Sequence, residues 1–199
     1  MKQEKKQKQV QPTSRKVEES LSYTVEVRDK DGRVLRHISA PSRSYVEQWN
    51  QLMNVMASHA NKTVKTTSGT DPSRSPADSI FACNAPIGNV LYGLRVGKGT
   101  TAVAIDDYAL GDPLGEGTET DEFNHQAVTF TEPSVAGSTC SFTIKRIMIN
   151  NSGSTITGIK EIGCYTWGYF LGFRDVLPGG VTVPDGGSIT VTYTIKVTV

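Results

Sequence analysis

The amino-acid sequence predicts an all-β protein, mainly an antiparallel, jelly-roll-like β-sandwich, with one amphipathic helix near the N-terminus and an extended N-terminal arm. Three observations lead to this prediction. About eight to ten short segments alternate apolar and polar residues between turn residues. Only one segment has the apolar period of a helix, whereas a parallel α/β fold needs several helices. Thr, Ser and Gly are abundant in the second half, as in β proteins with many tight turns.

Residues 1–20 are polar, lack apolar periodicity and are predicted to form an arm outside the core. Six basic residues and one acidic residue, Glu4, give the first sixteen residues a charge of +5. Because the whole chain carries +1, the rest carries −4. We expect the arm to contact an acidic neighbouring subunit, with a solvated tail as the alternative. Nucleic acid is not the expected partner, since the basic residues are not interleaved with aromatic ones. The basic residues are Lys2, Lys5, Lys6, Lys8, Arg15 and Lys16.

The predicted β-sandwich domain covers residues 21–199 and begins with a hairpin. Apolar Tyr23 and Val25 alternate with polar residues, which is typical of a half-buried strand. Asp31-Gly32 follows and precedes a second apolar run. This dipeptide favours a tight turn, because Gly adopts positive φ without a Cβ clash. The sequence therefore predicts two antiparallel strands at the start of the domain.

One helix is predicted over about residues 44–58. Its apolar side chains recur at a spacing that places them on one helical face. Ser44 and Glu47 have the spacing of a capping box, in which each side chain accepts a backbone amide. We expect the apolar face to pack on the sheet, and a partner-binding groove is the alternative. The residues of this face are Tyr45, Trp49, Leu52, Met53 and Met56.

The rest of the domain is predicted to be a long loop followed by strands. Residues 59–79 are polar, contain Gly and Pro, and show little periodicity, which indicates a loop. From Ile80 onward the patterns are those of strands. The alternation changes parity near Lys145-Arg146, which favours a β-bulge there. In the last run, the residues predicted to share one face are Ile189, Val191, Tyr193, Ile195, Val197 and Val199.

The sequence contains no catalytic constellation, and the protein is predicted not to be an enzyme. His37, His59 and His125 are scattered and form no metal-binding motif. The segment Gly93–Gly99 superficially resembles a phosphate-binding loop, but its first two glycines are too close together. Gly99 also stands where such a loop requires Ser or Thr. We therefore expect no cofactor and no metal.

Two features allow more than one interpretation. Carboxylates are dense between Asp106 and Glu122 and suit either a Ca²⁺ site or a solvated acidic loop that meets a neighbour's basic arm. Cys83, Cys140 and Cys164 form no metal-binding pattern and are expected to be buried free thiols. Cys140 and Cys164 would meet only if their strands were neighbours.

The amino-acid sequence also shows no targeting signal. No apolar run approaches the roughly 18 residues of a membrane-spanning helix. The basic, polar N-terminus lacks the apolar segment of a signal peptide. The sequence therefore predicts synthesis in a cytoplasm and no membrane contact.

Four stretches resemble structural proteins of tailed bacteriophages. They are VEVRDKDGRVLRHISAPSRSYVEQWNQLM (25–53), LRVGKGTTAVAIDDYALGDPLGEGT (94–118), ITGIKEIGCY (156–165) and FLGFRDVLPGGVTVPDGGSITVTYTIKV (170–197). The resemblance covers most of residues 22–199, and the basic arm lies outside it. It implies a virion component of the tail, decoration or minor structural type, made in the host cytoplasm. Its implied partners are copies of itself and other virion proteins, and it supplies no catalytic residues.

Two other functions are kept as alternatives. The first is a receptor- or carbohydrate-binding module of a tail fibre or tail tip, in which exposed aromatic rings stack on sugars. The second is an enzyme such as a depolymerase, for which the sequence offers no convincing set of residues. The aromatic side chains that would serve an interface or a sugar site are Tyr92, Tyr108, Tyr165, Trp167 and Tyr169.

Overall fold

The computed structural model describes residues 18–42, 44–58, 60–75 and 81–199. In this part of the chain there are thirteen strands and one helix, and eight of the strands are four or more residues long. The prediction of a mostly β, mainly antiparallel protein with a single helix is confirmed for these residues. The basic side chains of the predicted arm fall within residues 1–17, outside the described residues.

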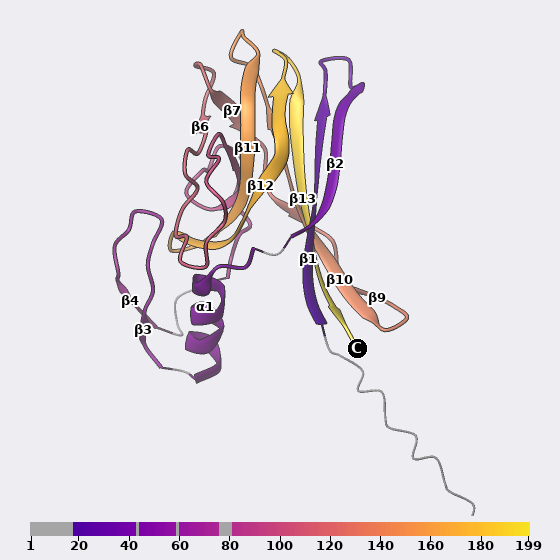
Figure 1. The fold of residues 1–199 in the computed structure, drawn as a ribbon. Coiled ribbons are helices and arrows are strands. Elements are labelled where there is room, and N and C mark those ends of the chain that lie inside the picture. The colour runs from indigo at the N-terminus through magenta and orange to yellow at the C-terminus, as the bar shows by residue number, and fades with distance from the viewer. Residues whose placement is uncertain (1–17, 43, 59, 76–80) are drawn as a thin grey trace, which may run out of the picture.

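Most strands belong to one large sheet (Figure 1). Its members are β1 (Glu18–Arg28), β2 (Val34–Ser42), β6 (Gly115–Glu116), β7 (Glu122–His125), β8 (Thr129–Phe130), β9 (Ser134–Ala136), β10 (Thr139–Ile149) and β13 (Ser188–Thr198). They run in the order β2-β1-β13-β10-β7-β6, with β8 and β9 also paired to β10. All these pairs are antiparallel except β6 with β7. Because β13 lies between β1 and β10, the first and last long strands of the described chain are neighbours.

A smaller sheet packs against the large one. It consists of β5 (Gly93–Gly97), β11 (Ile156–Thr166) and β12 (Phe170–Val183), in the order β12-β11-β5. The helix α1 (Glu47–Ser58) rests against β12, and Figure 1 shows it at the end of this sheet. Beside it lie β3 (Lys62–Thr63) and β4 (Ser73–Arg74), which form a two-stranded pair.

The chain crosses between the two sheets twice near its C-terminal end. From β10 it passes to β11 and β12 in the small sheet, and it then returns as β13 beside β10. Apolar side chains of both sheets form one core, in which the rings of Phe173 and Tyr193 are 4.6 Å apart. The buried Tyr193 hydroxyl donates to Asp175 Oδ2 at 2.8 Å, which satisfies its polar end.

The first hairpin forms as the sequence predicts. β1 and β2 pair antiparallel around Asp31-Gly32, where Gly32 has φ of 81°. The carboxylate of Asp29 accepts the backbone amides of Asp31 and Arg33 and so fixes the turn. The strand β1 begins at Glu18, so the domain starts three residues before the predicted boundary of the arm.

The helix is shorter than predicted, and its predicted apolar face is confirmed only in part: Leu52 is buried and Trp49 packs against the core. It begins at Glu47, whose amide donates to the carbonyl of Ile105, while the Ser44 hydroxyl pairs with that of Ser42. The predicted capping box is therefore wrong. The buried helix residues are Gln48, Leu52 and Val55, whereas Met53 and Met56 are 51% and 49% exposed. Residues 44–46 are extended along β12 and lie before the helix, so Tyr45 packs against the core from outside it.

The predicted β-bulge near Lys145-Arg146 is absent. β10 pairs with β13 in one continuous register from Thr139 to Ile149. The alternation does not change parity, because Arg146 occupies an inward position and is fully buried. Ile147 points to the other face and is partly exposed. The sequence pattern misled because a buried arginine stands where an apolar residue was expected.

The last strand buries only part of its predicted face. Ile189, Val191, Tyr193 and Ile195 are buried, as predicted. Val197 and Val199 are 42% and 57% exposed. In Figure 1 the ends of β1, β10 and β13 next to β9 reach beyond the small sheet, which explains this exposure. The predicted loop 59–79 contains the pair β3–β4, and its residues 59 and 76–79 lie outside the described residues.

Candidate functional site

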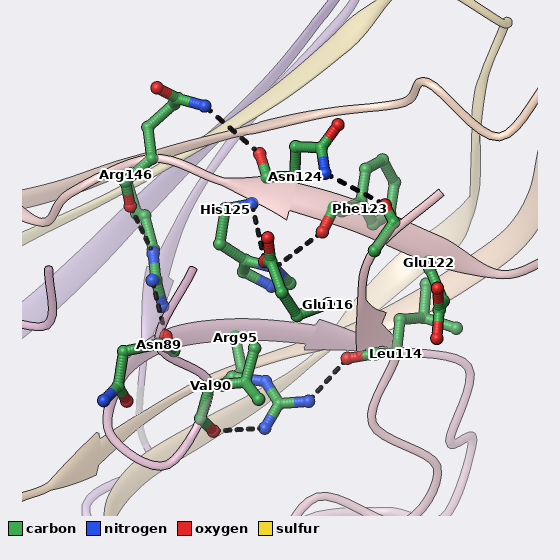
Figure 2. A network of polar contacts seen from close by, with 12 residues as sticks. Asn89, Val90, Arg95, Leu114, Glu116, Glu122, Phe123, Asn124, His125 and Arg146 are labelled. Carbon is green, nitrogen blue, oxygen red and sulfur yellow. Dashed lines mark hydrogen bonds and ion pairs between the residues drawn. The ribbon is translucent and has the colours of Figure 1, made fainter. Parts of the chain in front are cut away.

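A cluster of buried polar side chains forms where β5, β6, β7 and β10 meet. Figure 2 shows Arg95, Arg146, His125 and Glu116 in this cluster. Arg95 comes from β5, Glu116 from β6, His125 from β7 and Arg146 from β10. Arg146 and His125 are fully buried, and Arg95 is 7% exposed. Charged groups with so little solvent contact require compensating partners inside the protein.

Arg146 is held by backbone carbonyls. Its Nε donates to Gln126 O at 2.8 Å, and its Nη1 donates to Leu94 O at 3.1 Å. Its Nη2 donates to Asn89 O at 2.6 Å and to Pro86 O at 3.3 Å. Burial, and the second charge on Arg95, lower the pKa of Arg146 to about 10. Arg146 is therefore cationic at neutral pH and ties three segments of the chain together.

His125 is neutral at physiological pH. Its Nδ1 lies 2.7 Å from Glu116 Oε2 and 3.1 Å from Phe123 O, so this nitrogen carries the proton that it donates. Burial and the positive charge of Arg146 lower the pKa of His125 to about 4, although Glu116 acts in the opposite direction. The buried Nε2 has no hydrogen-bond partner among the described residues.

Arg95 is only partly satisfied. Its Nη1 and Nη2 donate to Val90 O and Leu114 O, as Figure 2 shows, but its buried Nε has no partner in the described part of the chain. Burial lowers the pKa of Arg95. Two guanidinium groups thus share this cluster with Glu116, whose carboxylate is the one that pairs with a cluster member among the described residues. The cluster carries more positive than negative charge, together with orphaned polar nitrogens on His125 and Arg95.

A pocket of about 280 Å³ opens beside Arg95. Its walls come from the loop after β3, the loop before β5, and the hairpin between β11 and β12. The pocket is small, near the lower end of ordinary ligand sites (roughly 300–1,000 Å³). It combines one cation, two aromatic rings, two hydroxyls and two apolar side chains. The lining residues are Thr67, Ser68, Val90, Leu91, Arg95, Tyr165 and Tyr169.

Tyr169 has an unusual backbone conformation for a bulky residue. It sits in the three-residue loop between β11 and β12 with φ of 69°, a position that favours glycine. Its amide donates to Thr166 O at 3.0 Å, and Gly168 before it has φ of 93°. The ring is 44% exposed at the pocket wall. Such a conformation costs about 1–2 kcal/mol for a non-glycine residue, so the surrounding fold must hold Tyr169 in it.

The five aromatic residues proposed from the sequence gather in one region but do different things. Tyr165 and Tyr169 line the pocket, and the Tyr165 hydroxyl accepts the amide of Leu110 at 2.9 Å. The rings of Tyr92 and Trp167 stack edge to face at 5.0 Å, with Tyr92 buried and Trp167 exposed. Tyr108 lies against the loop after β3, with the ammonium group of Lys65 5.3 Å from its ring centre.

A second buried network is centred on Glu161. This carboxylate, on β11, is fully buried and accepts the backbone amides of Gly99, Gly111 and Asp112 at 2.7–3.0 Å. It also accepts Arg174 Nε at 3.0 Å. The loop that resembles a phosphate-binding loop therefore presents its amide to a carboxylate of the same chain.

Arg174 completes that second network. Its Nη1 donates to Asp107 Oδ2 at 2.8 Å, and its Nη2 donates to Thr101 O at 2.9 Å. Burial alone would lower the pKa of Arg174, but the hydrogen bonds with Glu161 and Asp107 outweigh it and raise the pKa. One cation meets two carboxylates, so the network fastens the loop 99–112 to the small sheet.

The carboxylates between Asp106 and Glu122 contact different partners. Asp107 pairs with Arg174, and Asp121 accepts Lys98 Nζ at 2.6 Å. Glu116 contacts His125, so these carboxylates point in different directions. Among the described residues, no group of three or more His, Cys, Asp and Glu side chains is arranged to hold a metal ion.

An apolar groove of about 280 Å³ separates α1 from the large sheet. The small sheet contributes Cys164, Thr166 and Phe173 to its lining, which is almost entirely apolar. From the helix side come Trp49, Met53 and Phe81, and from the sheet side come Phe130, Phe142 and Ile195.

Two of the three cysteines reach this groove. Cys83 and Cys164 both line it and hydrogen-bond each other, which raises the pKa of Cys164 and lowers that of Cys83. Cys140 is exposed on β10, so the prediction of a buried thiol is wrong there. Cys140 and Cys164 lie in different sheets and are not strand neighbours. The thiol that contacts Cys164 is that of Cys83.

Sequence reasoning missed the buried charges. Arg95, Arg146 and Arg174 each stand in a strand and are buried, although a charged side chain in a strand is ordinarily expected to be exposed. A basic residue at an inward position of an alternating strand is the signal that could have identified them. The convergence of Glu116, His125 and Arg146 could not be anticipated, because it depends on how β6, β7 and β10 pair.

No family model, curated protein or solved structure matches this chain. No helix in the described part of the chain is both long and apolar enough to cross a membrane. The structure itself therefore carries the functional argument.

Proposed function

We propose that this protein is a structural component of a tailed-phage virion, such as a capsid decoration, cement, neck or tail protein. It acts by associating with copies of itself and with other virion proteins, and it is not an enzyme. Its two sheets form a rigid, jelly-roll-like unit of assembly. The two crossings between the sheets, which bring β13 back beside β10, support this architecture. The observation that carries the proposal is the open apolar groove between α1 and the large sheet.

The groove is the kind of surface that an isolated soluble protein seldom leaves open. Met53 and Phe130, on opposite sides of it, are 51% and 45% exposed. At the same end of the large sheet Val135, Val197 and Val199 are also exposed. Contiguous exposed apolar surface marks interaction sites, because its burial against a partner removes it from water.

A second copy of the chain is the occupant that the charges favour. The first sixteen residues carry a charge of +5 and the rest of the chain carries −4. The basic segment of one copy is therefore attracted to the acidic remainder of another copy. Asp106, Asp112 and Glu119 are exposed and take no part in the ion pairs of the described residues. The described chain begins at Glu18, at the end of the large sheet that carries the exposed valines.

The experiment compares two methionines of the same helix. Met53 lines the groove and Met56 does not, yet both are about half exposed. We expect Met53→Lys to lower incorporation into particles at least about tenfold, because a charge must be desolvated in the groove. Met56→Lys, the matched control, should incorporate normally. Equal incorporation of the two variants would contradict a role for the groove.

The arm is tested by a truncation that leaves β1 intact. Removal of residues 1–17 should preserve the cooperative thermal unfolding of the domain but weaken incorporation into particles, because it removes the positive charge. Normal incorporation of the truncated chain, at low and at physiological salt, would overturn the role of the arm.

A carbohydrate-binding module of a tail fibre or tail tip is the second candidate. The observation that favours it is the pocket beside Arg95, where Tyr169 keeps a strained backbone and an exposed ring. Aromatic faces and a few fixed polar groups are the usual elements of a sugar site. Screening the full chain on a glycan array tests this candidate, and an array without hits would remove it.

A further inference from the structure

The large sheet loses its cover at one end. On β13 the inward side chains Tyr193, Ile195 and Val197 are 0%, 8% and 42% exposed, in that order towards the C-terminus. On β10 the inward Ile144 is buried, whereas Cys140 near the start of the strand is exposed. In Figure 1 these strand ends reach beyond the small sheet. The inward positions continue the pattern of a two-layer core, but the small sheet does not cover them there.

The uncovered positions lie side by side on one face of the sheet. Cys140 is directly opposite Val197 on β13 and Val135 on β9, and directly opposite residues point to the same side of a sheet. Val135 is 75% exposed. Phe142, two residues from Cys140, connects this row to the apolar groove beside α1. These four residues, Val135, Cys140, Phe142 and Val197, form the exposed sheet end, and none of them is charged.

A second copy of the chain supplies a layer that fits this face. An uncharged sheet face can pack on another sheet face about 10 Å away, with the side chains of the two faces interdigitated. A twofold axis presents the same patch from both subunits, so each copy carries the surface that the other needs. The charges agree with this occupant. The described chain begins at Glu18 at this end, and the first sixteen residues, which precede it, carry +5 against −4 for the rest of the chain.

We propose that two copies pack through their exposed sheet ends about a twofold axis, so that each sheet end provides the second layer that the other lacks. This inference rests on the proposed assembly function and specifies the geometry of the contact. The axis passes near Cys140, because Cys140 lies between Val135 and Val197 in the row. The two Cys140 side chains therefore face each other across the interface.

Cross-linking of the purified full-length protein tests this geometry. A short bismaleimide that spans about the 10 Å spacing of packed sheets should link Cys140 of one copy to Cys140 of the other. Denaturing electrophoresis should then show a band at twice 21.6 kDa. The matched control is Ser134→Cys in a Cys140→Ser background, because Ser134 is also exposed but points to the opposite face from Val135. This control should give no more of the band than Cys140→Ser alone.

A pair of glutamate substitutions tests the strength of the contact. Val135→Glu places a charge on the exposed sheet end. It should raise the dissociation constant of the dimer at least about tenfold, measured by sedimentation, because the charge loses its water on association. Ser134→Glu, one residue earlier and on the opposite face, should leave that constant unchanged. Both positions are exposed, so we expect neither substitution to lower the thermal stability of the fold.

Three results would overturn the inference. An oligomer that forms without cross-linking at Cys140 and tolerates Val135→Glu would remove the twofold contact and leave assembly through the groove standing. Equal yields of cross-linked dimer from Cys140 and from the Ser134→Cys control would show that the thiols meet by collision. A full-length chain that stays single at every concentration would remove both this contact and the proposed self-association.

Discussion

Two buried networks of charge lie in this domain, and they differ in how completely they are closed. In the network of Glu161, Arg174 and Asp107, one cation meets two carboxylates, and three backbone amides meet the same Glu161 carboxylate. In the cluster of Arg95 and Arg146, two cations share Glu116 with a neutral histidine. Two buried nitrogens in this cluster have no partner among the described residues.

The difference indicates what each network is for. The amides of Gly99, Gly111 and Asp112 form an anion-binding surface, and the chain fills it with its own Glu161. That network holds a loop and has nothing left to offer a ligand. In the Arg95 cluster, two buried nitrogens have no partner among the described residues, and Arg95 also lines a pocket.

The largest expected effect comes from opening the closed network. Glu161→Ala leaves Arg174 buried with less compensation and removes the acceptor of three amides. We expect the free energy of unfolding to fall by about 3–5 kcal/mol, measured by urea denaturation. Glu132→Ala, at an exposed position, should change it by less than about 0.5 kcal/mol. A Glu161→Ala loss as small as that of the control would show that the network is not a structural fastening.

The next effect tests the neutral histidine of the other cluster. His125 has its pKa lowered from 6.5 to about 4 in the folded protein, while the unfolded chain takes up the proton near pH 6.5. The stability that His125 contributes is therefore complete above pH 6.5 and is lost as the pH falls towards 4. The expected loss over this window is about 3 kcal/mol.

The comparison of variants isolates this effect from other titrating groups. Burial raises the pKa of Asp175, which acts in the opposite direction as the pH falls. The wild-type protein should therefore lose more stability between pH 6.5 and 4 than His125→Gln does, as measured by denaturant midpoints. Exposed His37→Gln is the control and should follow the wild type. Parallel curves for the wild type and His125→Gln would mean that His125 is not held neutral by its surroundings.

The smallest expected effect has opposite signs for stability and binding. Tyr169→Gly should relieve the positive φ and raise the unfolding free energy by about 1 kcal/mol, while it removes the ring from the pocket and weakens sugar binding. Gly168→Ala is the neighbouring comparison: it should destabilise, because φ is 93° and its Cβ would lie 2.8 Å from the ring of Phe170. A destabilised Tyr169→Gly protein would show that the ring serves packing.

The two-layer β architecture could be predicted from the sequence because alternation is a local property. Each strand shows which residues face inward before its partners are known, and the run from Ile189 to Ile195 is buried as predicted. The helix and part of its buried face could also be predicted, since Leu52 is buried and Trp49 packs against the core, whereas Met53 and Met56 are exposed. Which helix residues are buried depends on how α1 packs on the rest of the fold, and the local apolar pattern does not contain that information.

The candidate site could be predicted only in part. Tyr165 and Tyr169 were singled out as aromatic candidates, and both line the pocket. Arg95 was not, because its position is meaningful only when β5 lies beside β11 and the guanidinium reaches Val90 and Leu114. Such long-range pairings are set by the packing of the whole domain and leave no local pattern.

The measurement that most directly tests the proposed assembly role is the mass of the purified full-length chain in solution, by sedimentation at several protein concentrations. The account predicts a species whose mass is a multiple of 21.6 kDa, and Met53→Lys should shift it towards the single chain. A wild-type protein that stays at 21.6 kDa across the whole concentration range would contradict it.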